Sequence, residues 1–96
     1  MNIVGEMIIG SRAVRGSNGA VHAVNPASGE TIEPAFGGAT AEDLEQACAL
    51  AGQAFDRYRA TTLEARAAFL EAIAENILAL GDVLIERCVA ESGLLR

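Results

Sequence analysis

The sequence predicts an α/β fold in which an N-terminal β-hairpin and a short strand are followed by three α-helices. Three observations lead to this prediction. Residues 1–38 are rich in glycine and β-branched residues, and an Asn-Gly turn signal lies among them. From Ala39 onward, apolar residues recur at the spacing of a helix. The length of 96 residues suits one domain at most, so a modest core is expected.

The β-rich part is expected to extend over about residues 6–36. Short apolar runs predict strands at about 6–14 and 20–24, and Asn18-Gly19 lies between them. Because Asn-Gly favours the tight turns that join antiparallel strands, these two strands are expected to pair with each other as a hairpin.

A second chain reversal is expected in the stretch N-P-A-S-G-E at residues 25–30. Pro26 keeps Asn25 out of the helical region of backbone conformation, and Ser-Gly is a common turn pair. A third extended run follows at about residues 31–36. The stretch is therefore expected to bring one extended segment back beside another.

The first helix is expected at about residues 41–59. Thr40 is a favourable N-cap, and Asp43 stands three residues later, at the capping-box position. A stripe of apolar residues then recurs at helical spacing, which predicts a surface helix with one buried face. The stripe consists of Leu44, Ala47, Cys48, Ala51, Ala54, Phe55 and Tyr58.

The second helix is expected at about residues 62–80. Thr61 and Glu64 predict a capping box at its start, and Gly81 is the expected stop. Apart from a narrow ridge of glutamates, the helix is apolar or small around its circumference, so it needs cover on most sides. The ridge consists of Glu64, Glu71 and Glu75, and its carboxylates are expected to be solvated.

The third helix is expected at about residues 83–92. Asp82 is the expected N-cap, and Gly93 can end the helix. Two adjacent leucines, Leu94 and Leu95, follow it, and such a pair would normally be buried against other protein.

The charge balance is acidic, with thirteen Asp and Glu against seven Arg and a net charge of −6. Nucleic acids and anionic membrane surfaces attract basic proteins, so neither is an expected partner. No apolar run reaches the length of a membrane span, and the first residues do not form a signal-peptide pattern. The two cysteines form no C-x-x-C motif or disulfide framework, which favours a cytoplasmic setting.

Few residues are candidates for chemistry. Cys48 and Cys88 stand among apolar residues and are expected to be buried structural cysteines rather than nucleophiles. His22 is the only histidine, so a metal or catalytic site would need other partners. The Gly37-Gly38 pair precedes a helix, but acidic residues in the first turn of that helix would repel a phosphate.

Glu91 has an electrostatic requirement of its own. It falls in the last turn of its predicted helix, where the helix dipole disfavours a carboxylate. A compensating cation or hydrogen-bond donor is one expectation, and an exposed acid at little cost is the other.

Several motifs, in order along the chain, resemble those of the aldehyde dehydrogenase superfamily. The stretch at residues 25–30 resembles the family's N-P-[AS]-T-G-E turn. The helix opening at 39–44, A-F-D-R-Y-R at 54–59, R-A-A-F-L at 66–70 and E-S-G at 91–93 are similar to family motifs in the same order. Departures from the pattern are Ser28 and Ser92 in place of threonine, Tyr58 in place of tryptophan and Leu95 in place of proline.

A narrower resemblance is to the bacterial α-ketoglutaric semialdehyde dehydrogenases, carried by residues 5–10, 36–40 and 47–51. It implies oxidation of 2-oxoglutarate semialdehyde to 2-oxoglutarate. The family resemblance implies that residues 1–96 are the N-terminal part of a Rossmann-like domain that binds NAD or NADP, in an enzyme about five times longer. The expected partners are the remainder of the same chain and further copies in a homo-oligomer.

The family's chemistry uses a cysteine thiolate that attacks the aldehyde and a glutamate that assists hydrolysis of the thioester. In the family both residues lie far beyond residue 96, as do the main cofactor-binding residues and the catalytic and oligomerisation domains. The resemblance therefore places no catalytic or cofactor-binding residue in this chain. It does imply a structural monovalent cation, held by the backbone carbonyl of Val24 and the carboxylate of Glu91.

A second hypothesis comes from a different class of protein. The chain would then be a small acidic helical binding or assembly module, complete in itself, whose three helices form an interface for a partner. The order of the motifs favours the dehydrogenase segment, and the short chain favours the module.

Overall fold

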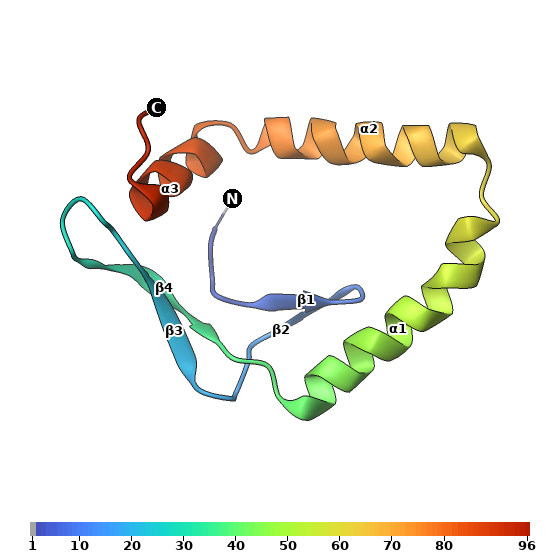
Figure 1. The fold of residues 1–96 in the computed structure, drawn as a ribbon, viewed down its shortest axis with the longest axis horizontal. Coiled ribbons are helices and arrows are strands. Elements are labelled where there is room, and N and C mark those ends of the chain that lie inside the picture. Colours follow the sequence, from blue (N-terminus) through green and yellow to red (C-terminus); the bar gives the residue numbers. More distant parts are fainter. Residues whose placement is uncertain (1) are drawn as a thin grey trace.

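The computed structural model describes residues 2–96 and has the expected α/β composition, with four short strands before three helices (Figure 1). The strands form two separate antiparallel pairs, β1 with β2 and β3 with β4. In chain order the elements are β1 (Met7–Ile9), β2 (Arg12–Val14), β3 (Ala20–Val24), β4 (Thr31–Gly37), α1 (Ala41–Arg59), α2 (Leu63–Ala79) and α3 (Asp82–Ser92).

The expected pairing of residues 6–14 with 20–24 is wrong. The first run folds back on itself at Gly10-Ser11, so that Met7 pairs with Val14 in a hairpin of its own. Asn18-Gly19 instead meets the end of β4, because the backbone N–H of Asn18 donates to the Gly38 carbonyl at 3.0 Å. Asn18-Gly19 therefore holds the segment before β3 against the segment after β4.

The reversal expected at residues 25–30 is confirmed, because this stretch joins β3 to β4 in antiparallel register. The Asn25 N–H donates to the Glu30 carbonyl at 2.8 Å, and the Gly29 N–H donates to the Asn25 carbonyl at 2.7 Å. The Asn25 side chain also accepts from the Ala27 N–H at 2.9 Å. The Asn-Pro sequence thus closes the turn with its own side chain.

The capping box at the start of α1 is confirmed. The Thr40 hydroxyl accepts from the Asp43 N–H at 3.1 Å, and the Asp43 carboxylate accepts from the Thr40 N–H at 2.9 Å. The box expected at Thr61 and Glu64 is wrong. Thr62 caps α2 by accepting from the Ala65 N–H, whereas the Thr61 hydroxyl donates to the Tyr58 carbonyl at the end of α1.

The third helix ends as predicted and begins differently. Gly93 directly follows the last helical residue, Ser92, and adopts the left-handed conformation, with φ 71°. The residue before the helix is Gly81, with no side-chain cap, and Asp82 lies in the first turn instead of capping it. The acidic side chain still lies near the positive end of the helix dipole.

Two backbone segments cross closely at the base of the β3–β4 hairpin. A Cβ atom added to Gly37 would overlap the backbone of Gly16, so a side chain has no room there. Together with the Asn18–Gly38 hydrogen bond, this crossing fixes the direction in which the chain enters α1.

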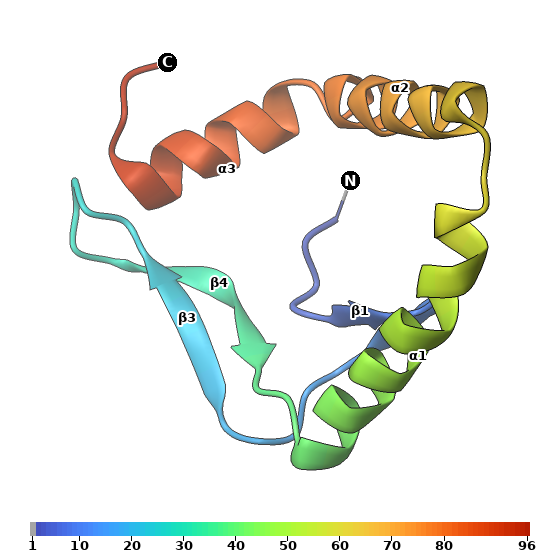
Figure 2. The same cartoon turned by 45° about the vertical axis from the view of Figure 1, so that its right-hand side comes forward.

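The elements follow one another around an open arrangement in which α2 lies apart from both strand pairs (Figures 1 and 2). The radius of gyration is 16.8 Å, whereas a compact domain of this length has about 12.5 Å. The accessible surface is 7427 Å², against about 5200 Å² for a compact protein of this mass. The chain therefore exposes about 2200 Å² more than a compact fold would.

The buried faces predicted for the helices are not formed within these residues. Among residues 2–96, the buried large apolar side chains amount to Ile9 alone, which is 5% exposed. None of the residues of the three helices is buried. Phe55 on the expected α1 face is 63% exposed, and Leu95 is 99% exposed. Cys48 and Cys88, expected to be buried, are exposed as well. The apolar stripes have the predicted spacing, but residues 2–96 contain little that packs against them.

Candidate functional site

The two residues predicted to hold a cation belong to elements that come together. Val24 is the last residue of β3, and Glu91 lies in the last turn of α3. Helix α3 contacts β3. The residue after α3, Gly93, lies against Pro26 in the turn that follows Val24.

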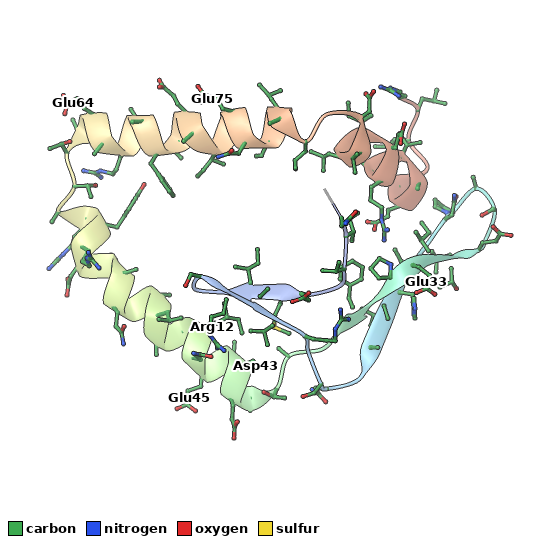
Figure 3. All side chains as sticks on the ribbon, turned by 180° about the vertical axis from the view of Figure 1, so that it is seen from behind. Arg12, Glu33, Asp43, Glu45, Glu64 and Glu75 are labelled. Carbon is green, nitrogen blue, oxygen red and sulfur yellow. The ribbon has the colours of Figure 1, made fainter. Side chains whose placement is uncertain are left out.

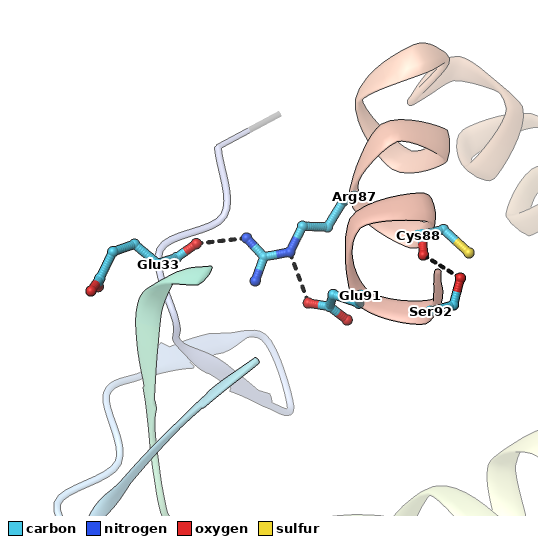
Figure 4. Close-up of polar contacts among 5 residues, drawn as sticks. All are labelled: Glu33, Arg87, Cys88, Glu91 and Ser92. Carbon is cyan, nitrogen blue, oxygen red and sulfur yellow. Dashed lines mark hydrogen bonds and ion pairs between the residues drawn. The ribbon is translucent and has the colours of Figure 1, made fainter. Parts of the chain in front are cut away.

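Arg87 is the centre of the polar contacts at this junction (Figure 4). Its Nη1 donates to the backbone carbonyl of Glu33 on β4 at 2.7 Å, and its Nε donates to the Glu91 Oε1 at 2.8 Å. The Arg87 side chain is 17% exposed, whereas the Glu91 side chain is 43% exposed, so the guanidinium is largely covered and its carboxylate partner is in contact with water. Arg87 therefore joins β4 to α3 through a hydrogen bond between residues 54 positions apart in the sequence.

The expectation that Glu91 has a compensating hydrogen-bond donor is confirmed, and the donor is Arg87. A carboxylate at the carboxyl-terminal end of a helix is destabilised by the helix dipole, and a cation there is stabilised. The Arg87 guanidinium supplies the positive charge one helical turn earlier, at Nε 2.8 Å from Oε1. The monovalent cation at Val24 and Glu91 stays a prediction, and such an ion would share Glu91 with Arg87.

The end of α3 also fits the turn at residues 25–30 by shape. Gly93 is left-handed, and a Cβ atom at this position would lie 3.0 Å from Cγ of Pro26. The Ser92 hydroxyl donates to the Cys88 carbonyl at 2.6 Å and accepts from the Leu94 N–H. A serine hydroxyl thus ties the chain leaving the helix back to its last turn.

Sequence reasoning missed Arg87. Its position four residues before Glu91 is a signal for a pair on one helix face, and this signal could have been read. The acceptor on Glu33 could not have been predicted from the sequence, because every residue has a backbone carbonyl. The Nη2 atom of Arg87 is buried without a hydrogen-bond partner among residues 2–96.

Of the other candidates, His22 adjoins this junction and the glutamate ridge of α2 lies apart from it. His22 approaches Glu33 across the β3–β4 pair, with Nε2 3.4 Å from Oε2. The glutamate ridge of α2 is solvated as expected, and Glu64 and Glu75 point away from the molecule (Figure 3). Within residues 2–96, His, Cys, Asp and Glu side chains form no group of three that could hold a metal ion. None of the helices described has the length and apolarity needed to cross a membrane.

Residues 13–95 match the model of the aldehyde dehydrogenase family. The chain belongs to this family. It is 59% identical to alpha-ketoglutaric semialdehyde dehydrogenase 2 of Azospirillum brasilense over 98% of its length, and 33% identical to alpha-ketoglutaric semialdehyde dehydrogenase of Acinetobacter baylyi over 94%. It spans only 18% and 17% of those two proteins. No solved structure matches the chain.

Two of the family-like motifs occupy neighbouring positions in this aldehyde dehydrogenase segment. The N-P-A-S-G-E turn and the E-S-G end of α3 meet where Gly93 faces Pro26, although more than sixty residues separate them in sequence. Arg87 adds the hydrogen bonds that hold the helix and the strand in this position. The contact geometry gives both motifs a role in packing.

Proposed function

We propose that these residues are the N-terminal part of the cofactor-binding domain of an NAD- or NADP-dependent aldehyde dehydrogenase. Its substrate would be 2-oxoglutarate semialdehyde, which it oxidises to 2-oxoglutarate. The observation that carries this proposal is the 59% identity over 98% of the chain to a protein named for that semialdehyde. The whole enzyme would be a cytoplasmic homo-oligomer.

Within that enzyme the segment has a structural role. Its cysteines lie on two different helices, and its polar junction is formed by an arginine, a glutamate and a backbone carbonyl. The Gly37-Gly38 approach to α1 does not suit a dinucleotide phosphate, because Glu42 and Asp43 occupy the first helical turn. Catalytic and cofactor-binding groups would therefore come from other parts of the polypeptide.

The experiment uses the full-length protein, by which we mean the product of the whole reading frame that contains these residues. Purified protein is supplied with 2-oxoglutarate semialdehyde and either NAD or NADP, and reduced nicotinamide is followed by absorbance. Glutarate semialdehyde is the matched control, because it lacks only the 2-oxo group. We expect faster turnover of the 2-oxo substrate.

Three results would contradict this proposal. Equal or faster turnover of glutarate semialdehyde would remove the substrate assignment. Turnover by the isolated 96 residues would contradict their structural role. A reading frame that stops after Arg96, together with a folded monomer of 96 residues, would favour the self-contained module.

A further inference from the structure

The Asn18-Gly19 pair lies in the link between β2 and β3, outside the junction around Arg87. Both residues are exposed, and the backbone of Gly19 has φ 72°. A Cβ atom built on Gly19 meets nothing within 4 Å, so the space beside this residue is open. Asparagine is chemically labile, and a following glycine hinders its deamidation least because no side chain screens the attacking nitrogen. The structure therefore presents a reactive pair at a defined place in the fold.

Deamidation at this pair is a reaction of the chain with itself, followed by a reaction with water. The backbone nitrogen of Gly19 attacks Cγ of Asn18, so that an N–Cγ bond forms and the Cγ–Nδ2 bond breaks. The Nδ2 group takes up the proton of the Gly19 nitrogen and leaves as ammonia, and a cyclic succinimide remains. Water then opens the ring at either carbonyl carbon, which yields aspartate or isoaspartate. The net change converts an amide and water to a carboxylate and ammonium, without an oxidant or a reductant.

Asn18 is also the residue that holds the crossing at the base of the β3–β4 hairpin. Its N–H donates to the Gly38 carbonyl at 3.0 Å, and its Nδ2 donates to the Ala39 carbonyl at 3.1 Å. The Gly38 N–H in turn donates to the Gly19 carbonyl at 3.1 Å. These three hydrogen bonds form a clamp on the reactive pair. The clamp holds the leaving group on an acceptor and fixes the backbone that must rotate before the ring can form.

Each product is incompatible with part of this clamp. Aspartate has an oxygen in place of Nδ2, so the donor to the Ala39 carbonyl is lost and two oxygens face each other. Isoaspartate routes the main chain through Cβ, which inserts an additional atom between the two backbone groups that bind Gly38. The contact is already tight, because a Cβ atom on Gly38 would lie 2.1 Å from the Asn18 carbonyl oxygen.

We propose that Asn18 is a site of spontaneous deamidation, and that the clamp restrains the reaction until the crossing opens locally. Once the reaction has taken place the clamp does not re-form, so each conversion loosens the entry of the chain into α1 irreversibly. The modification also adds a negative charge to a chain whose net charge is already −6. The inference concerns the β-rich part of the chain and does not depend on the substrate of the enzyme.

The test incubates the native full-length protein at mildly alkaline pH and follows each asparagine by peptide mass spectrometry, with fragmentation that separates isoaspartate from aspartate. Asn25 is the matched internal control, because the nitrogen of Pro26 carries no hydrogen and does not form the ring. Asn76 is a second control, because α2 holds the next backbone nitrogen in a helical hydrogen bond and Ile77 is β-branched. A sample unfolded in guanidinium chloride gives the rate without the clamp.

We expect Asn18 to convert in the native protein while Asn25 and Asn76 remain unconverted over the same time. In the unfolded sample Asn18 should react about tenfold or more faster, because in the native protein the clamp has to open first. Gly37→Ala forces a methyl group into the crossing and should raise the native rate, whereas Gly52→Ala adds a methyl group in open space and should leave it unchanged. If Gly37→Ala does not fold, the unfolded sample alone measures the restraint.

The consequence of the modification is measured on the converted protein, which ion exchange separates by its additional negative charge. We expect this fraction to unfold at a lower denaturant concentration than the unconverted protein. Conversion of Asn18 no faster than that of Asn25 in the native protein would overturn the site. Equal rates in the native and unfolded samples would overturn the restraint, and an unchanged unfolding midpoint would overturn the link between the modification and the crossing.

Discussion

The β-rich part and the helical part of this chain depend on different interactions. Residues 2–40 fold on themselves: the hairpins pair internally, Ile9 is buried, and the backbone segments at Gly16 and Gly37 are in direct contact. Residues 41–96 contain regular helices with no buried residue, and the first two of these helices have side-chain N-caps. The comparison shows that regular secondary structure and a packed core are separate requirements.

The difference follows from where each element finds its hydrogen bonds. A strand must pair with another strand, so folding of the β-rich part necessarily brings distant backbone groups together. A helix satisfies its interior backbone within itself, and its apolar face is then the part that needs a neighbour. Helix α2 can therefore be complete in hydrogen bonding and still lack cover.

The largest expected effect comes from removing whatever lies outside the 96 residues. The isolated chain buries only about half of its unfolded surface, against about 60% for a small domain. We expect weak stability and a broad thermal transition by circular dichroism. A sharp transition above about 60 °C would show that the helical part needs no further cover.

The next effect tests the tight crossing in the β-rich part. Gly37→Ala in the full-length protein would place a methyl group against the Gly16 backbone. We expect a loss of about 3 kcal/mol or more, the upper range for overpacking, from the urea midpoint. Gly52→Ala in α1 is the control, because its added methyl meets open space and should stabilise by up to about 1 kcal/mol. Equal effects would mean that the crossing is not tight.

A smaller effect tests the junction between the two parts. Arg87→Met keeps most of the apolar stem and removes the hydrogen bonds to Glu33 and Glu91. We expect a loss of about 2 kcal/mol in the free energy of unfolding, because two hydrogen bonds from a charged donor are removed. Arg59→Met removes an exposed pair with Asp56 and should cost less than about 1 kcal/mol. A cost for Arg87→Met as small as that of Arg59→Met would show that the junction contributes little.

The smallest effect distinguishes two neighbouring threonines. Thr62→Ala removes the N-cap of α2 and should cost about 1 kcal/mol by chemical denaturation. Thr61→Ala removes a hydroxyl that donates to the end of α1, and we expect a smaller loss. If Thr61→Ala proved the more costly change, the assignment of the cap would be wrong.

Features that depend on adjacent residues could be predicted from the sequence. The Thr40 capping box, the reversal at residues 25–30 and the end of α3 at Gly93 all follow from local backbone chemistry. The choice between Thr61 and Thr62 as the N-cap of α2 could not be predicted, because either threonine can cap a helix. In the structure the Thr61 hydroxyl donates to the end of α1, and Thr62 is the cap. Strand pairing also failed, because the Asn18-Gly19 signal does not tell which segment its backbone will bind.

Burial and the candidate site were harder for a related reason. The apolar spacing around Cys48 and Cys88 correctly located the helices, but burial depends on a second surface, which residues 2–96 do not supply. At the junction, the need of Glu91 for a positive partner was evident from helix electrostatics. The identity of the strand acceptor was not, because it is a main-chain oxygen of Glu33.

That main-chain acceptor has a consequence for how the two positions tolerate mutation. Almost any side chain at position 33 leaves the carbonyl in place, so substitutions there should be accepted freely without a matching change elsewhere. Position 87 has no such freedom, because its donors come from the side chain itself. Genetic variation should therefore accumulate on the strand and be restricted on the helix, even though both ends belong to one hydrogen bond.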